Sequence, residues 1–156
     1  NRQLFYDRAG IAIANAKRGN EKIAVISYDV FGLKNINDHW GHMAGDHVII
    51  TVSNRLTSLL RKGDTVSRFG GDEFVILLDG INRTEDVIVI AKKMIACVLE
   101  PVEFEGDRIA ATASLGVAMY PADALEIGTL IRKSDEAMYY VKTHGRNGVK
   151  LYSEMG

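Results

Sequence analysis

The segment Arg68–Phe74 places two adjacent carboxylates directly after a pair of glycines. Strand-like residues flank Gly70 and Gly71, so we predict a hairpin whose central residues adopt positive φ. Glycines without side chains would let another molecule approach the backbone there. The crowded carboxylates of Asp72 and Glu73 need a cation or a proton to relieve their repulsion. Taken alone, the segment is equally typical of a solvated acidic turn.

A further carboxylate, Asp29, stands at the end of the apolar run 22–30. We interpret this run as a buried strand and expect the hairpin to be its neighbour in a sheet. Asp29 beside Asp72 would form the oxygen-rich site that Mg²⁺ prefers. Because the only cysteine is Cys97, a cysteine-based zinc site is excluded, and oxygen ligands favour Mg²⁺ or Mn²⁺.

A polar cluster follows this strand. Asparagine and aspartate side chains close together can recognise a purine, since a carboxylate accepts from a ring N–H and an exocyclic amine. A lysine beside them could contact a phosphate. Alternatively, Asn37 and Asp46 are helix caps, a common place for both residue types. The members of the cluster are Lys34, Asn37, Asp38, His42, Gly45 and Asp46.

Two further charged pairs have two interpretations each. Lys142 and Arg146, four residues apart on the predicted last helical turn, could clamp a triphosphate or could simply complement the helix dipole. Arg61 and Asp64 precede the strand of the hairpin, and a surface ion pair explains this spacing as well as a binding site does.

Composition limits the class of protein. The chain has 156 residues, 47% hydrophobic and 25% charged, with a net charge of −1, which suits one globular domain rather than a disordered chain or a coiled coil. The balanced charge argues against a nucleic-acid partner, and no apolar run is long enough to predict membrane contact by this domain. A single cysteine favours a reduced, cytoplasmic setting, which is compatible with a membrane anchor elsewhere in a parent protein.

Hydrophobic periodicity predicts an α/β (α+β) fold with helices over one central sheet, in the order αβαββαββα. The second hairpin should turn at Glu105-Gly106-Asp107, and Gly145 should close the last helix. The predicted helices cover residues 4–19, 44–61, 84–100 and 124–144, with a short helical turn before residue 44.

At Gly70–Phe74 the sequence resembles the GGDEF family of diguanylate cyclases. The resemblance extends from Asn1-Arg2 to Gly145-Arg146-Asn147, with the segments LKNINDHWGHMAGD, TASLGVAMYP and SDEAMYYVKTHGRN in family order. It implies a mostly antiparallel five-stranded sheet flanked by helices, the ferredoxin-like palm of nucleotidyl cyclases. We expect residues 1–156 to be a single GGDEF domain excised from a longer multidomain signalling protein, because no initiating methionine is present.

The resemblance also implies an activity. Two GTP molecules would condense to cyclic di-GMP and two pyrophosphates across an antiparallel homodimer, each 3′-hydroxyl attacking the partner's α-phosphate. Two Mg²⁺ or Mn²⁺ ions per active site would bridge the phosphates. By the same resemblance, product would bind at Arg61 and Asp64 and hold the domains apart.

Residue roles are carried over position by position. The metal ligands would be Asp29, Asp72 and the Val30 carbonyl, with Asp72 or Glu73 assisting deprotonation; which of the two remains open. Arg2 matches a catalytic position near the phosphates. The positions that match substrate contacts are Lys34, Asn37, His42, Asp46, Gly70, Gly71, Lys142 and Arg146.

One position departs from the family pattern. Many members have a second acidic residue two positions after the strand-end aspartate, and this sequence has Phe31. The alternative is therefore a non-catalytic module that binds GTP or cyclic di-GMP and controls an attached domain such as a phosphodiesterase. The retained pair Asp72 and Glu73 favours the enzyme, because a binding module has no evident need for it.

Overall fold

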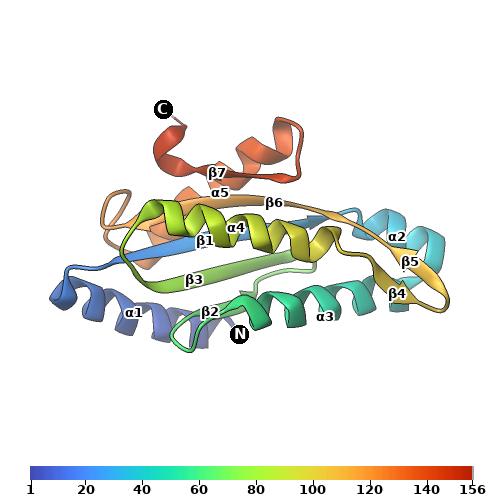
Figure 1. The fold of residues 1–156 in the computed structure, drawn as a ribbon, viewed down its shortest axis with the longest axis horizontal. Coiled ribbons are helices and arrows are strands. Elements are labelled where there is room, and N and C mark those ends of the chain that lie inside the picture. The colour runs from blue at the N-terminus through green and yellow to red at the C-terminus, as the bar shows by residue number, and fades with distance from the viewer. Residues whose placement is uncertain (156) are drawn as a thin grey trace.

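The computed structural model describes residues 1–155, and its centre is a five-stranded sheet with strand order β2-β3-β1-β6-β7 (Figure 1). Strands β2, β3, β1 and β6 pair antiparallel in that order, and β7 pairs in parallel with β6. The predicted mostly antiparallel sheet is confirmed. The strands of this sheet are β1 (Lys22–Phe31), β2 (Thr65–Arg68), β3 (Glu73–Ile81), β6 (Thr112–Tyr120) and β7 (Gly148–Leu151).

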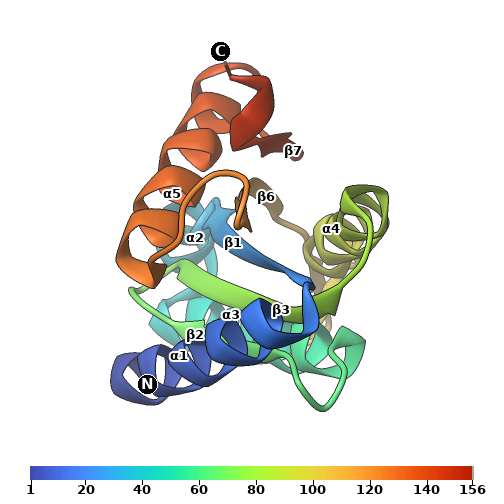
Figure 2. The same ribbon diagram turned by 90° about the vertical axis from the view of Figure 1, so that its left-hand side faces the viewer.

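Helices cover both faces of the sheet, which explains the apolar run in β1. Eight consecutive residues of β1 are buried, because a central strand faces a helical layer on each side. Helices α3 and α4 pack on the face of Ile26 and Tyr28, and α1 and α5 on the face of Ile23 and Val25 (Figure 2). The helices are α1 (Arg2–Gly19), α2 (Leu33–Trp40), α3 (His42–Leu59), α4 (Thr84–Leu99) and α5 (Ile127–Thr143).

Helix α5 lies unusually close to β6 at one position. A Cβ atom on Gly116 would lie 2.1 Å from the Ser134 carbonyl oxygen and 2.2 Å from the Met138 nitrogen, both in the α5 backbone. The buried hydroxyls of Ser27 and Ser134 meet at 2.7 Å beside this contact. A residue without a side chain therefore sets how deeply α5 sits on the sheet.

The hairpin of β2 and β3 forms as predicted, but the glycine prediction was wrong. Neither Gly70 nor Gly71 has a positive φ. The connection is a wider loop, held by the Arg68 guanidinium, which donates to the Gly70 carbonyl at 3.0 Å and to the Gly71 carbonyl at 2.6 Å. Hydrogen bonds from a side chain therefore hold this loop, whereas a two-residue turn would have needed positive φ at its central residues.

Three further elements differ from prediction. The short helical turn before residue 44 is a full helix, α2, and β7 was not predicted. The predicted second hairpin does turn at Glu105 and Gly106, both with positive φ, but it forms a separate ribbon of β4 (Val102–Phe104) and β5 (Asp107–Ile109). Residues from Thr112 onward belong to the central sheet instead.

Candidate active site

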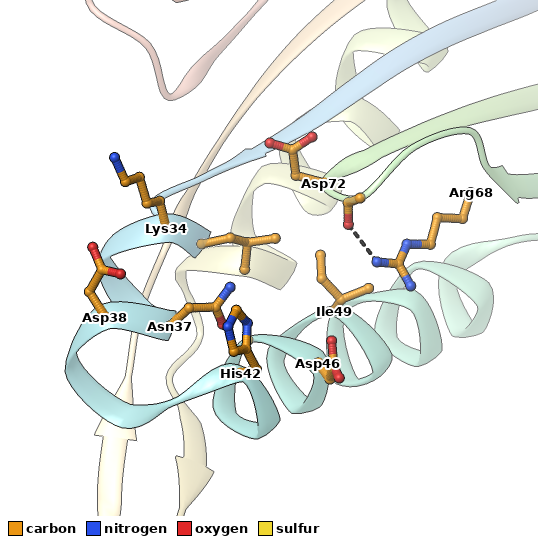
Figure 3. Close-up of a pocket in the computed structure, with 11 residues that line it drawn as sticks. Lys34, Asn37, Asp38, His42, Asp46, Ile49, Arg68 and Asp72 are labelled. Atoms are coloured by element: carbon orange, nitrogen blue, oxygen red, sulfur yellow. Dashed lines mark hydrogen bonds between the residues drawn. The ribbon is translucent and has the colours of Figure 1, made fainter.

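Two adjoining cavities open at one end of the central strand. The first, of about 460 Å³, lies between α2, the start of α3 and the hairpin loop (Figure 3). The second, of about 400 Å³, lies between the end of β1, the start of α2 and the segment that ends α5. Leu33, Lys34 and Asp72 line both, so the two cavities are neighbours. Their sizes fall in the range of small-molecule sites.

The turn from β1 into α2 forms the floor of the second cavity. Gly32 has a φ of 105°, a conformation that favours glycine and lets the chain enter the helix at once. The first residues of α2, from Leu33 to Asn35, line the cavity and include no acidic side chain. Backbone N–H groups of a first helical turn lack partners within the helix and attract anions.

Asn37 packs against a glycine of the next helix. Its Oδ1 lies 1.9 Å from where a Cβ of Gly45 would be, and this oxygen is buried without a hydrogen-bond partner. His42 and Asp46 of α3 line the same cavity (Figure 3). The capping alternative is wrong, because Asn37 lies inside α2, Asp46 lies inside α3, and Gly41 precedes α3 as its cap.

The structure brings the predicted carboxylates together. Asp29 and Glu73 are cross-strand neighbours in the β1–β3 pair, and the Val30 N–H donates to the Asp72 carbonyl at 2.8 Å. Burial raises the pKa of Asp29, and the charge of Asp72 raises it further. The Lys142 ammonium, 3.2 Å from Asp29 Oδ2, opposes both effects.

Asp135 of α5 is an acidic residue that the sequence analysis missed. Burial raises the pKa of Glu73, and the nearby charges of Asp135 and Asp29 raise it further. Asp135 precedes Lys142 by two helical turns, which places both residues on one face of the helix. This spacing could have predicted that Asp135 faces the carboxylates together with Lys142. Arg68 belongs to the motif segment, and the sequence predicted no role for it; in the structure it lines the first cavity and holds the loop.

Lys142 and Arg146 both line the second cavity, but they do not share the last helical turn as predicted. Helix α5 ends at Thr143, and Arg146 lies beyond it with a φ of 59°. The Arg146 guanidinium carbon lies 3.7 Å from the centre of the Phe31 ring. A positive-φ segment after the helix therefore brings Arg146 back to the end of β1.

Three residues predicted for catalysis or substrate binding lie outside both cavities. Glu73 and Gly70 belong to the hairpin, of which Arg68, Gly71 and Asp72 line the first cavity. Arg2, at the start of α1, lies against the same loop. Its guanidinium donates to the Phe69 carbonyl at 3.2 Å, and the guanidinium carbon lies 4.5 Å from the centre of the Phe69 ring.

Arg61 and Asp64 form a separate structure between α3 and β2. Asp64 is buried and accepts from the Arg61 N–H at 2.9 Å and from the Asp79 N–H at 3.0 Å. The Arg61 side chain is 60% exposed and pairs with Asp64 at 3.5 Å. The ion pair exists, and Asp64 holds the loop. The Arg61 guanidinium also donates to the Asp79 carbonyl, while most of the Arg61 side chain is exposed.

The donor set fits a hard divalent cation. The groups available are the Asp29 and Asp72 carboxylates and the Val30 carbonyl, all oxygen ligands. A positive charge, the Lys142 ammonium, already lies against Asp29. Within residues 1–155, no group of three or more His, Cys, Asp or Glu side chains is arranged to hold a metal ion, so any ion here would complete its shell with other oxygens.

The fold and site together define a palm domain of the nucleotidyl-cyclase type. Residues 1–148 match the family described as "Diguanylate cyclase, GGDEF domain". The chain belongs to the GGDEF domain family.

Two curated relatives show the extent of the likeness. MucR of Pseudomonas aeruginosa, a bifunctional diguanylate cyclase and cyclic di-GMP phosphodiesterase, is 37% identical over 95% of this chain and 22% of MucR. The diguanylate cyclase TpbB of the same species is 35% identical over 97% of this chain and 35% of TpbB. The chain therefore spans about a third or less of these relatives.

Solved structures agree with the fold. The GGDEF domain of TpbB has a TM-score of 0.94 at 35% identity, over 97% of this chain and 89% of that one. The GGDEF domain of DgcB from Caulobacter crescentus, solved with cyclic di-GMP, has a TM-score of 0.88 at 26% identity, over 99% of this chain and 91% of that one. In the described part of this chain, no helix is long and apolar enough to cross a membrane.

Proposed function

We propose that this domain is a diguanylate cyclase that condenses two GTP molecules to cyclic di-GMP and two pyrophosphates. The observation that carries the proposal is the meeting of two cavities at Asp72. One offers amide and carboxylate groups suited to a purine, and the other is lined by cationic side chains beside a carboxylate pair. A nucleoside triphosphate needs both environments in contact.

The first cavity would hold guanine. The Asp46 carboxylate can accept from the guanine N1–H and 2-amino groups, and the Asn37 amide can complete the recognition. His42, at the first position of α3, would contact the substrate beside them. Because buried polar groups without partners cost free energy, the orphaned Asn37 Oδ1 supports a site that a polar ligand completes.

The second cavity would hold the triphosphate. Lys34, Lys142 and Arg146 line it, and the first turn of α2 adds backbone N–H groups. Gly71 would let the substrate approach the hairpin backbone closely, with Gly70 beside it. Catalysis of phosphoryl transfer depends mainly on positioning and charge neutralisation, which these groups supply.

Asp29, Asp72 and the Val30 carbonyl would hold divalent metal, two Mg²⁺ or Mn²⁺ ions per active site. Diguanylate cyclases of this family generally use divalent metal ions. When bound, such ions neutralise phosphate charge and acidify an attacking hydroxyl. Displacing Lys142 from Asp29 would free the ammonium for a phosphate oxygen, while Asp72 or Glu73 takes the hydroxyl proton.

A homodimer would complete the reaction. Two domains would pair antiparallel, so that each GTP 3′-hydroxyl attacks the α-phosphate of the partner's GTP. Arg2 holds the hairpin loop through the Phe69 carbonyl, so we give it a positioning role in catalysis. GTP is an intracellular substrate, and we therefore place the domain in the cytoplasm, within a longer signalling protein.

Turnover by this domain and by Asp72→Asn tests the cyclase. We expect cyclic di-GMP from GTP and Mg²⁺ with the wild type, and a loss of at least a hundredfold with Asp72→Asn, since this variant removes a charge at the reacting phosphate. Asp86→Asn, an exposed aspartate in the first turn of α4, is the matched control and should keep full activity. An inactive wild type that dimerises and binds GTP would contradict the proposal.

Product inhibition at Arg61 is a second part of the proposal. The exposed Arg61 guanidinium can pair with a guanine edge, and cyclic di-GMP is bound in the DgcB structure. Arg61→Ala should raise the inhibition constant for cyclic di-GMP about tenfold or more without lowering the initial rate. Asp64 is the poorer test, because its two hydrogen bonds to backbone N–H groups hold the loop.

The alternative is a regulatory module that binds GTP or cyclic di-GMP and controls an attached domain such as a phosphodiesterase. Phe31 at a position that is acidic in many relatives favours it, and MucR combines both activities in one chain. Nucleotide binding without product in the experiment above would select this alternative.

A further inference from the structure

Phe31 has an unusual place for an apolar residue. It ends β1 two residues after Asp29, and 42% of its surface is exposed. It lines the second cavity together with the cationic side chains of Lys34, Lys142 and Arg146. The carboxylates of Asp29 and Asp72 line the same cavity, so Phe31 lies among charged side chains of both signs.

The contact between Phe31 and Arg146 fixes the guanidinium. The guanidinium carbon lies 3.7 Å from the ring centre, well within cation–π range. The Arg146 backbone is held as well, since its N–H donates to the Val141 carbonyl at 2.9 Å. Among the ion pairs of residues 1–155, none involves Arg146.

Because Phe31 is neutral, it leaves the positive charge of the Arg146 guanidinium uncompensated. A carboxylate at position 31 would also attract Arg146, but it would cancel the positive charge that faces the cavity. An aromatic ring orients the guanidinium through its π face and adds no negative charge. Arg146 thus keeps its full charge and its donor groups for an anion.

We propose that Phe31 is a positioning residue that holds Arg146 at the cavity for the triphosphate of GTP. This inference rests on the proposed function. Phe31 acts through Arg146, so its contribution should vanish when Arg146 is removed. It should also depend on an aromatic face and not on apolar bulk.

Calorimetric titration with 3′-deoxy-GTP and Mg²⁺ tests this, because that nucleotide binds without a hydroxyl to react. We expect Phe31→Ala and Phe31→Leu to raise Kd about two- to fivefold, as an exposed cation–π pair of about 0.5–1 kcal/mol implies. Phe31→Trp should restore wild-type affinity. In an Arg146→Ala background, Phe31→Ala should change Kd no further. With GTP as substrate, KM should rise and kcat should change little.

Phe104→Ala on the β4–β5 ribbon is the matched control, a partly buried phenyl ring outside both cavities, and it should leave Kd unchanged. Equal affinity of Phe31→Leu and wild type would overturn the inference, as would additive effects of the Phe31 and Arg146 substitutions. A wild type that does not bind 3′-deoxy-GTP would instead overturn the proposed function.

Discussion

The carboxylates of the site are arranged at a cost to folding. Asp29 and Glu73 are paired on the adjacent strands β1 and β3, with Asp72 and Asp135 nearby. Burial and repulsion between these carboxylates raise the pKa of both Asp29 and Glu73. A raised pKa means that the folded state binds the proton more tightly than the unfolded chain. The ionised carboxylate therefore destabilises the fold, increasingly as pH rises through the raised pKa.

Glu73→Gln should accordingly stabilise the metal-free domain at neutral pH. The gain should shrink as pH falls and vanish below the ordinary pKa of 4.5, because wild-type Glu73 is then protonated in both states. Urea unfolding of both proteins across this pH range measures the difference. A variant less stable than the wild type at neutral pH would show that Glu73 is held by favourable contacts instead.

Gly45 packs against Asn37, the residue that we propose contacts the base. A side chain there would overlap Asn37 Oδ1, so Gly45→Ala should displace the Asn37 amide. We expect affinity for 3′-deoxy-GTP to fall about tenfold, with reduced preference over 3′-deoxy-ATP. The fold should not lose stability, because alanine is favoured over glycine in a helix by about 1 kcal/mol.

Gly10→Ala provides the control for this prediction. Gly10 is an exposed glycine inside α1 with no atom within 4 Å of an added Cβ. Gly10→Ala should stabilise α1 by a similar amount and leave nucleotide affinity unchanged. Unchanged affinity in Gly45→Ala would mean that Asn37 does not read the base.

At the scale of elements, α5 is the part that assembles the site. It carries Asp135 and Lys142 over the end of β1, and the chain that follows it returns Arg146 to the same place. The depth at which α5 sits depends on Gly116, where the helix backbone approaches β6 directly.

Gly116→Ala should therefore force α5 away from the sheet. Overpacking of this kind costs about 1–3 kcal/mol, and the Lys142–Asp29 pair should separate. We expect a lower urea midpoint together with a loss of cyclase activity. Gly148→Ala on β7 is the matched control, because its added Cβ would meet atoms no closer than 3.7 Å.

The sequence predicted most of these elements. The features that it missed are stabilised by contacts with residues outside the local sequence pattern. The opening helix, β1 and α4 follow from hydrophobic periodicity and appear close to their predicted bounds. Strand β7 is short and half-buried, and it forms because β6 offers a free edge. The hairpin loop could not be predicted in detail either, since Arg68 shapes it by hydrogen bonds.

At the scale of the whole molecule, the candidate site suits one nucleotide. The two cavities that meet at Asp72 together suit one base and one triphosphate. We therefore propose that a second copy of the domain supplies the second GTP. Activity should depend on the concentration of the dimer.

Specific activity should consequently rise with protein concentration and level off once dimers dominate. Initial rates over a dilution series, compared with sedimentation of the same samples, measure this dependence. We expect the two curves to have the same midpoint. A specific activity independent of concentration while the protein is monomeric would rule out catalysis between two chains.

The sequence by itself determined the family, the sheet with its helical layers, and the residue types at the site, because hydrophobic period and motif spacing are properties of the chain alone. The tertiary structure decided how those residues meet. Asp135 joins the carboxylates through the docking of α5, Arg146 reaches Phe31 through a positive-φ segment, and Asn37 fits against Gly45 across two helices. These contacts join positions far apart or on different elements, and their geometry depends on packing that no local pattern records.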